Sequence, residues 1–222
     1  MADLRWYSIH SVWCDGRMDP RTLDPVQFDA LREAANIGAA HAATALSQIT
    51  NRRVMIEVPE VAVIPLEEVG SILGDPAVGV CAVIMEVYGK VSGRTLQVFP
   101  EATAARLTNV LLRTREPLLP SEFGLIERSA LKEIGNILVA AYLNALSALT
   151  GETLTMSAPA FAYDMAGAIL TTTYLNFGAD DDYVFCVATR MTLDRGVDLP
   201  AFFLMIPDAP SLEGILQALR VA

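Results

Sequence analysis

The two halves of this 222-residue chain repeat one another. Residues 32–61 align with residues 132–161 without a gap, at an offset of 100 residues. The first segment shares Glu33, Asn36, Ile37, Ala40, Ala45, Leu46, Ser47, Thr50 and Pro59 with the second, where they are Glu133, Asn136, Ile137, Ala140, Ala145, Leu146, Ser147, Thr150 and Pro159. Such a duplication predicts a pseudo-twofold molecule with one shared core, rather than two linked domains.

The repeat sets the expected domain organisation. We expect one domain over residues 24–222, made of a first unit (24–118) and a second unit (119–222). No Pro/Ser-rich linker separates the two units, which agrees with a single domain. Residues 1–23 form an N-terminal segment outside the repeat and receive no assignment.

Each unit has the pattern of a long helix, several strands and a shorter closing helix. The long helices are expected over 24–51 and 121–151, with Asp24–Pro25 suited to a helix start and Asn51 and Gly151 to helix ends. The closing helices are expected over 101–112 and 210–221. Strands are expected over 54–63, 79–88, 94–99, 153–163, 168–177, 183–192 and 201–206. This order predicts an α/β fold with an antiparallel sheet and two long helices.

Charge and composition exclude several classes of function. The net charge is −10, and Lys and Arg form no basic stripe, so nucleic-acid binding is not expected. The three cysteines, Cys14, Cys81 and Cys186, are scattered, which argues against a disulfide framework and favours a reducing cytoplasm. The two histidines, His10 and His41, form no ligand pair, so a zinc site is not expected.

The chain is apolar, at 53% hydrophobic residues, yet it does not look like a membrane protein. Its longest charge-free stretches, 34–51 and 134–151, only reach the lower limit of a spanning helix and contain Asn, Ser and Thr. They are expected to be buried core helices. The N-terminus lacks the pattern of a signal peptide, so we expect a cytoplasmic protein without membrane insertion.

Each long helix carries a short polar stripe. Asp29, Glu33 and Asn36 fall at positions i, i+4 and i+7, within about 60° of one another on a helix, and the second unit repeats the spacing with Ser129, Glu133 and Asn136. A structural explanation exists, because a Glu near a helix start gains from the helix dipole and an Asn can be solvated. A functional role is favoured because the set recurs, because the rest of the helix diverges more, and because Asn is a poor helix former.

Only a few kinds of reaction are possible for a stripe of these residue types. Neither stripe contains a His or Cys that could form a nucleophile–base pair. A carboxamide can hold a water in line for attack on phosphorus, as Gln does in GTPases. A neighbouring carboxylate can pair with a lysine of a partner protein. The combination suits a protein that completes the phosphoryl site of another protein.

The full pattern, [Asp/Ser]-x3-Glu-x2-Asn-x22-Pro, resembles the signature of the CheC/CheX/FliY family of chemotaxis phosphatases. It occurs from Asp29 to Pro59 and again from Ser129 to Pro159, and the resemblance covers about residues 24–222. Two complete sites in one chain look like CheC within this family.

The resemblance implies hydrolysis of the aspartyl phosphate of CheY-like response regulators. Asn36 and Asn136 would orient the attacking water, and Glu33 and Glu133 would engage the active-site lysine of the regulator. The supporting positions would be Asp29, Pro59, Ser129 and Pro159. No cofactor of its own is implied, and magnesium would belong to the regulator.

Two other readings stay open at the level of sequence. The chain could be a non-catalytic adaptor that binds a response regulator, the receptor deamidase CheD or the flagellar switch. The C-terminal helix (209–222) would be the CheD-docking surface, or its Leu212, Ile215, Leu216 and Leu219 would simply cover the sheet. A small-molecule hydrolase lacks a nucleophile or metal constellation and ranks behind both.

Overall fold

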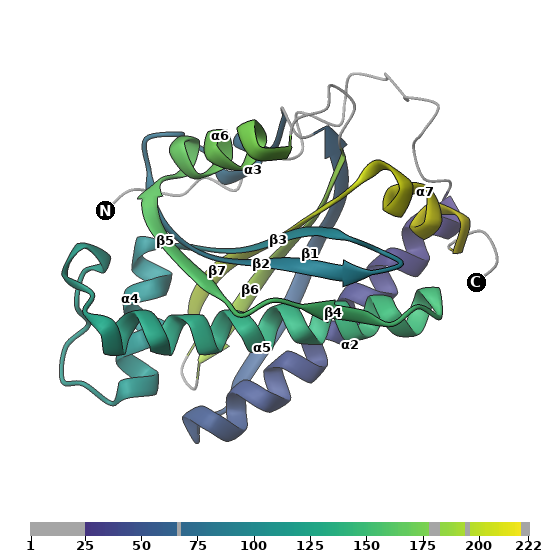
Figure 1. Ribbon diagram of the computed structural model, residues 1–222. Coiled ribbons are helices and arrows are strands. Elements are labelled where there is room, and N and C mark those ends of the chain that lie inside the picture. The colour runs from purple at the N-terminus through teal and green to yellow at the C-terminus, as the bar shows by residue number, and fades with distance from the viewer. Residues whose placement is uncertain (1–24, 66–67, 178–182, 194–195, 219–222) are drawn as a thin grey trace.

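The computed structural model describes residues 25–65, 68–177, 183–193 and 196–218, and the N-terminal segment 1–23 lies outside them. The helices are α2 (Pro25–Thr50), α3 (Val69–Leu73), α4 (Glu101–Leu112), η2 (Pro120–Glu122), α5 (Leu125–Thr150), α6 (Ala166–Phe177) and α7 (Ala209–Ala218). The strands are β1 (Val54–Pro65), β2 (Gly79–Gly89), β3 (Gly93–Pro100), β4 (Leu154–Met156), β5 (Ala160–Met165), β6 (Tyr183–Leu193) and β7 (Val197–Pro207). The expected antiparallel sheet with two long helices is confirmed (Figure 1).

The two units exchange strands within one sheet. The strand order is β1-β6-β7-β3-β2-β4, and β5 continues the β4 edge by pairing with β2. The first strand of the first unit, β1, therefore pairs with β6 of the second unit, while β4 and β5 of the second unit pair with β2 of the first. The centre of the sheet is the β3–β7 pair, one strand from each unit.

The register of the exchanged strands repeats the symmetry of the sequence. Val54 faces Leu193, and its counterpart Leu154 faces Gly89. At the other end of these strands, Pro65 faces Tyr183, and Met165 faces Gly79. In both cases the edge-strand residues are 100 positions apart. The pseudo-twofold symmetry expected from the repeat is therefore present in the hydrogen-bond pattern of the sheet.

The sheet has helices on both faces. Helices α2 and α5 lie across one face and α3 and α6 across the other (Figure 1). The larger core lies on the α2/α5 side and includes Leu131, Val83 and Met191, all at most 1% exposed. The smaller core on the α3/α6 side includes Leu96 and Leu204 from the central strands. Alternation of side chains along each strand supplies both cores.

Small residues bring the long helices close to their neighbours. A Cβ atom added at Gly38 of α2 would lie 2.7 Å from Cδ1 and 3.1 Å from Cα of Tyr142 in α5. A Cβ atom added at Gly135 of α5 would lie 2.7 Å from Cβ of Val83 in β2. The backbones at these two glycines are therefore in contact with residues that a larger side chain would displace.

The largest error of the sequence analysis concerns residues 168–177. They were expected to form a strand, but they belong to helix α6. Among its described side chains, Ala166, Ile169 and Thr173 are buried, at a helical spacing of i, i+3 and i+7. The pairing of α6 with α3 against the second face of the sheet overrides the local strand preference.

Smaller corrections concern two boundaries and one additional helix. The expected strand 153–163 is divided into β4 and β5. The expected helix 121–151 begins at Leu125, because Pro120–Glu122 form a separate 3₁₀ turn and Phe123 and Gly124 are extended. Helix α3, which no sequence signal had indicated, occupies the position in the first unit that α6 occupies in the second.

Among the described residues, α5 is the one helix long and apolar enough to cross a membrane by length and composition. Half of its most apolar stretch is buried inside the protein, where Leu131, Ile134 and Leu138 pack against the sheet. A core helix of a globular protein meets the same criteria.

We predict that Gly38→Ala destabilises the protein although alanine is the better helix former. The added methyl group overlaps Tyr142, and overpacking of this kind costs about 1–3 kcal/mol. Gly214→Ala in α7 is the matched control, since nothing lies within 4 Å of its added Cβ, and it should gain up to about 1 kcal/mol. Denaturant unfolding measures both, and equal stabilities of the two variants would contradict the close approach at Gly38.

Candidate functional site

The first polar stripe lies on the outward face of α2. Asp29, Glu33 and Asn36 are all exposed, whereas Leu31 and Ala35, on the opposite face of the helix, are at most 7% exposed. The long helix has this orientation because its apolar residues recur at helical spacing and pack against α5 and the sheet. The three polar side chains are therefore brought together in one row on the surface.

The second stripe repeats this arrangement on α5. Ser129 and Glu133 are exposed, and Asn136 is half-buried. Leu131 and Ile134, which face the core, are at most 1% exposed. The two sites thus share a geometry but differ in one respect, because the carboxamide of the second site is more enclosed by the protein than that of the first.

The four central side chains have no partner within the described part of the protein. Glu33, Asn36, Glu133 and Asn136 form neither a side-chain hydrogen bond nor an ion pair with another described residue. Helix geometry places each Glu and Asn, three residues apart, about 4.5 Å apart along the axis. Each pair therefore presents one carboxylate and one carboxamide, adjacent and available to an external partner.

Other residues of the repeat have structural roles. The Ser47 hydroxyl donates to the carbonyl of Ala43 at 2.7 Å, and accepts from the backbone N–H of Val54 at 3.0 Å. Its counterpart Ser147 donates to the carbonyl of Glu152 at 2.5 Å. These bonds connect the end of each long helix to the segment that follows it.

Thr50 and Thr150 form side-chain hydrogen bonds in the last turn of each long helix. The Thr50 hydroxyl donates to the carbonyl of Leu46 at 2.6 Å, and the Thr150 hydroxyl to that of Leu146 at 3.0 Å. Leu46 and Leu146 are both buried in the larger core. The repeated serine, threonine and leucine residues are thus explained by folding, whereas the repeated Glu and Asn are not.

The two repeated prolines lie in interruptions of the edge strands. In β1 the register shifts between Glu57 and Glu60, around Pro59. Pro159 lies between the end of β4 and the start of β5. Proline has no N–H to donate to a ladder and is tolerated at edges and bulges. Both prolines therefore shape the exchanged strand that follows each site helix, and neither lies on a polar stripe.

The backbone around Pro159 is held by one residue. The N–H of Ser157 donates to the carbonyl of Glu86 at 2.9 Å, and the N–H of Glu86 donates to the Ser157 hydroxyl at 3.0 Å. A side chain thus replaces a backbone acceptor where the ladder is broken. The bulge leaves the backbone N–H of Glu86 without a backbone acceptor, and the Ser157 hydroxyl accepts its hydrogen bond instead.

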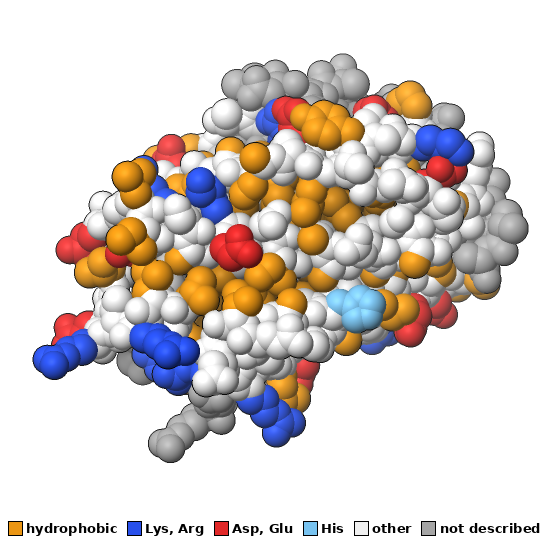
Figure 2. Space-filling view, turned by 60° about the horizontal axis from the view of Figure 1, so that its bottom comes forward, with side chains coloured by type: hydrophobic (Ala, Val, Ile, Leu, Met, Phe, Trp, Pro, Cys, Tyr) orange, Lys and Arg blue, Asp and Glu red, His pale blue; other side chains and the backbone are white. Residues whose placement is uncertain are grey.

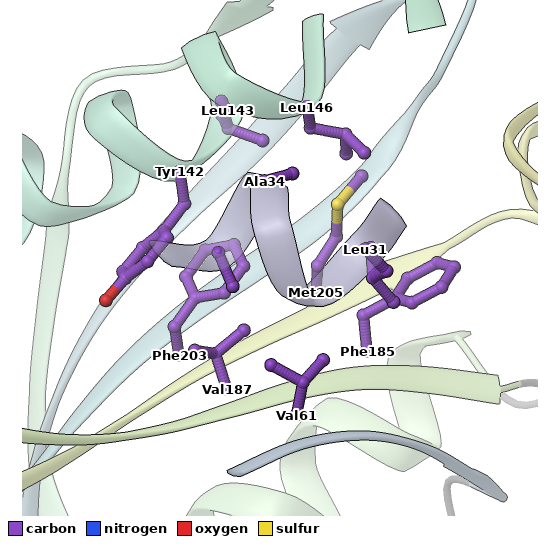
Figure 3. A pocket seen from close by; sticks show the side chains of 11 residues that line it. Leu31, Ala34, Val61, Tyr142, Leu143, Leu146, Phe185, Val187, Phe203 and Met205 are labelled. Atoms are coloured by element: carbon purple, nitrogen blue, oxygen red, sulfur yellow. The ribbon is translucent and has the colours of Figure 1, made fainter. Parts of the chain in front are cut away.

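A small cavity of about 30 Å³ lies between α2, α5 and the sheet (Figure 3). Its lining is apolar and includes Leu31, Val61 and Met205. Tyr142 also lines it, and stacks on Phe203 with ring centroids 4.9 Å apart. The cavity contains no residue of either stripe, so the chemistry of the stripes belongs to the surface.

The side of the molecule that carries α2 and α5 is shown in Figure 2. Hydrophobic side chains are spread across it among isolated charges, and Lys and Arg lie at several separate places on it. Two exposed aliphatic residues, Val26 and Ile126, lie one turn before Asp29 and Ser129 on the stripes. The sequence analysis did not single them out, although the 100-residue offset relates them as well.

The described cysteines are buried away from both stripes. Burial raises the pKa of Cys81 to about 12, and the charge of Glu101 adds to this shift. Burial likewise raises the pKa of Cys186 to about 12, with a further contribution from Glu60. Thiols of this kind are not nucleophiles near neutral pH. Cys14 lies outside the described residues.

Glu101 also joins the two units. It begins α4 of the first unit and accepts a short hydrogen bond from the hydroxyl of Tyr163 in β5 of the second. This bond raises the pKa of Tyr163 to about 12, and burial and the charge of Glu101 act in the same direction. The contact is structural, since neither residue belongs to a stripe.

The described residues show no specific site for a metal ion and none for the docking of a CheD-like protein. Within those ranges no group of three or more His, Cys, Asp or Glu side chains could hold a metal ion. In α7, Leu212 and Ile215 are buried against the larger core, as expected if this helix covers the sheet, and Gln217 is exposed. Docking of a CheD-like protein on α7 stays a prediction.

Comparison with known proteins gives a consistent set of relatives. The model of the CheC-like family matches residues 26–63 and 126–163, the two segments that carry the stripes. The CheY-P phosphatase CheC of Bacillus subtilis is 31% identical over 196 residues, which cover 87% of this chain and 93% of that protein.

Solved structures show the same fold. FliY of Thermotoga maritima superposes with a TM-score of 0.74 and 22% identity, over 90% of this chain and 98% of that one. The middle domain of FliM from H. pylori superposes with a TM-score of 0.66 and 16% identity, over 88% of this chain and 99% of that one.

We predict that the buried cysteines are unreactive in the folded protein. With pKa values of about 12, roughly one thiol in 10,000 is ionised at pH 8, and burial also blocks access. A Cys14→Ser variant should release no colour from a disulfide reagent until denaturant is added. Rapid reaction of one thiol in the native variant would show that Cys81 or Cys186 is accessible.

Proposed function

This chain belongs to the CheC-like family, and from that premise we propose that it is a phosphatase for the aspartyl phosphate of a CheY-like response regulator. The observation that carries the proposal is a carboxylate next to a carboxamide on the outward side of a helix, which occurs twice and has no partner among the described residues. Three of these four side chains are exposed, and Asn136 is half-buried. The name of the Bacillus subtilis relative supports the choice of substrate.

Asn36 and Asn136 would orient the attacking water. The side-chain oxygen of a carboxamide accepts a hydrogen bond from water, and its NH₂ group can donate to an oxygen of the phosphoryl group. A water held in this way attacks phosphorus in line with the bond to the aspartate. A P–O bond forms to the water oxygen while the P–O bond to the carboxylate breaks, and the proton of the water ends on inorganic phosphate.

Glu33 and Glu133 would hold the regulator in place. A carboxylate on the helix surface can pair with a lysine of the partner, and such charge-assisted hydrogen bonds are the stronger class. The glutamate lies one helical turn before the asparagine, so a lysine bound there fixes the phosphoryl group opposite the carboxamide. Asp29 and Ser129, one further turn back, would support the same contact.

The leaving carboxylate and any metal would belong to the regulator. Magnesium bound there would neutralise charge on the phosphoryl oxygens. The helix surface of this protein then needs to supply only position and hydrogen bonds, which agrees with stripes that contain neither His nor Cys. We further propose that the protein acts in chemotaxis signalling in the cytoplasm, where such regulators are phosphorylated.

We predict that the two sites act separately. Glu33→Ala with Asn36→Ala should leave the activity of the second site, and Glu133→Ala with Asn136→Ala that of the first. The quadruple variant should lose at least about 100-fold in rate, because positioning of the water and of the partner is lost together. Phosphate release from a CheY-like regulator charged with acetyl phosphate is the measurement.

The matched control is a carboxamide near the far end of the first site helix. Gln48 is exposed and lies about 18 Å beyond Asn36 along α2, so Gln48→Ala should keep the full rate. Full activity of the quadruple variant would refute the phosphatase. Binding of the phosphorylated regulator without turnover by the wild type would instead support the adaptor.

We also predict that the dependence on magnesium follows the regulator. The rate should rise with the magnesium occupancy of the regulator, and prior treatment of this protein alone with a chelator should not change it. Elemental analysis of the purified protein should find no stoichiometric transition metal. One metal ion per chain, lost together with activity, would overturn this assignment.

A further inference from the structure

Two aliphatic side chains occupy the same exposed position in the two units. Val26 is 68% exposed and Ile126 is 67% exposed, in the first turns of α2 and α5. They are 100 residues apart, the offset that relates the two stripes. Resting on the proposed function, we infer that Val26 and Ile126 are docking residues that set the affinity for the phosphorylated regulator.

The position of these residues on the helix supports the inference. Val26, Asp29, Glu33 and Asn36 follow at i, i+3, i+7 and i+10, so all four lie on one face. Val26 is about 10 Å from Glu33 and about 15 Å from Asn36 along the axis. The same intervals hold for Ile126 in the second unit.

The size of a protein partner makes contact at this position unavoidable. A specific protein–protein interface buries about 800 Å² on each side, a patch with a radius of roughly 16 Å. A regulator centred on Glu33 and Asn36 therefore covers Val26 as well. A free amino acid or metabolite bound at the same pair would not reach it.

The residues next to each stripe are suited to bind a phosphorylated protein partner. Arg32 and Lys132 directly precede the two glutamates, and neither forms an ion pair with a described residue. In a chain of net charge −10, the same cationic position thus recurs at both sites. Cations complement the negative phosphoryl site of the partner, while the aliphatic residues supply apolar contact.

Ile37 and Ile137 are a further pair of apolar residues beside the two stripes. Ile37 is 42% exposed and directly follows Asn36, and Ile137 follows Asn136 but is partly packed against the core. Val26 and Ile37 thus flank the first pair of catalytic residues along the helix. Because Val26 and Ile126 are the more exposed residues, they can be changed with the least effect on folding.

Because Val26 and Ile126 are proposed to bind the regulator, changing them should alter the KM and leave kcat as it is. Val26 and Ile126 lie too far from the water-orienting carboxamide to touch the reacting atoms. Val26→Ser with Ile126→Ser should raise the KM for the phosphorylated regulator about tenfold, as expected for loss of a buried aliphatic contact, and leave kcat unchanged. Changes at Glu33 and Asn36 should act on the rate instead.

The experiment measures phosphate release against regulator concentration for the full chain. The matched control is Ile49→Ser with Val197→Ser, because these residues are 41% and 43% exposed and lie off the stripes. The control should keep the wild-type KM. Val26→Leu with Ile126→Leu should restore most of the affinity, and thermal unfolding should be unchanged in all variants.

Two outcomes would overturn the inference and are distinguishable. If the wild type releases phosphate normally and the serine variant keeps its KM, the docking role alone is wrong. If the wild type releases no phosphate from the regulator, the proposed function fails and the docking role with it. Should the serine variant lose stability, Val26→Thr with Ile126→Thr, which keeps both side chains β-branched, decides between the same outcomes.

Discussion

The exchange of edge strands between the two units is the constraint on which the rest of the structure depends. β1 closes the half of the sheet formed by the second unit, and β4 and β5 close the half formed by the first. Neither unit can therefore complete its own sheet or cover its own apolar face. Because each site helix leads directly into an exchanged strand, folding of one shared core positions both sites at once.

The same arrangement explains how an apolar helix can carry a polar site. The buried side of each long helix uses glycine, alanine and leucine to approach the sheet and the other helix, as at Gly38 and Gly135. The outward side is then free of packing requirements. Glu33 and Glu133 are exposed on helices whose position is fixed by the core, so the proposed site would be preorganised without a cleft.

A surface site of the proposed kind would divide the chemistry between two proteins. Buried thiols and an apolar cavity offer no reaction centre within the described residues. Under the proposed function, the helix surface would contribute hydrogen bonds and shape, and the substrate would be a folded protein that brings its own reactive group. Affinity would then depend on residues around the proposed reacting pair, which is why Val26 and Ile126 are proposed in addition to Glu33 and Asn36.

The sequence by itself determined the features that are encoded locally. Helical spacing predicted the outward stripes, and the ends of the long helices lay near Asn51 and Gly151 because those residues tolerate the left-handed conformation that they adopt. Alternation and turns located most strands. Tertiary structure decided the rest: residues 166–177 became a helix by packing with α3, the strands found partners in the opposite unit, and Pro59 and Pro159 came to lie in edge bulges. The physical reason is that periodicity and turn preference act over a few residues. Strand pairing and burial depend on which segments, far apart in the chain, meet in the folded core.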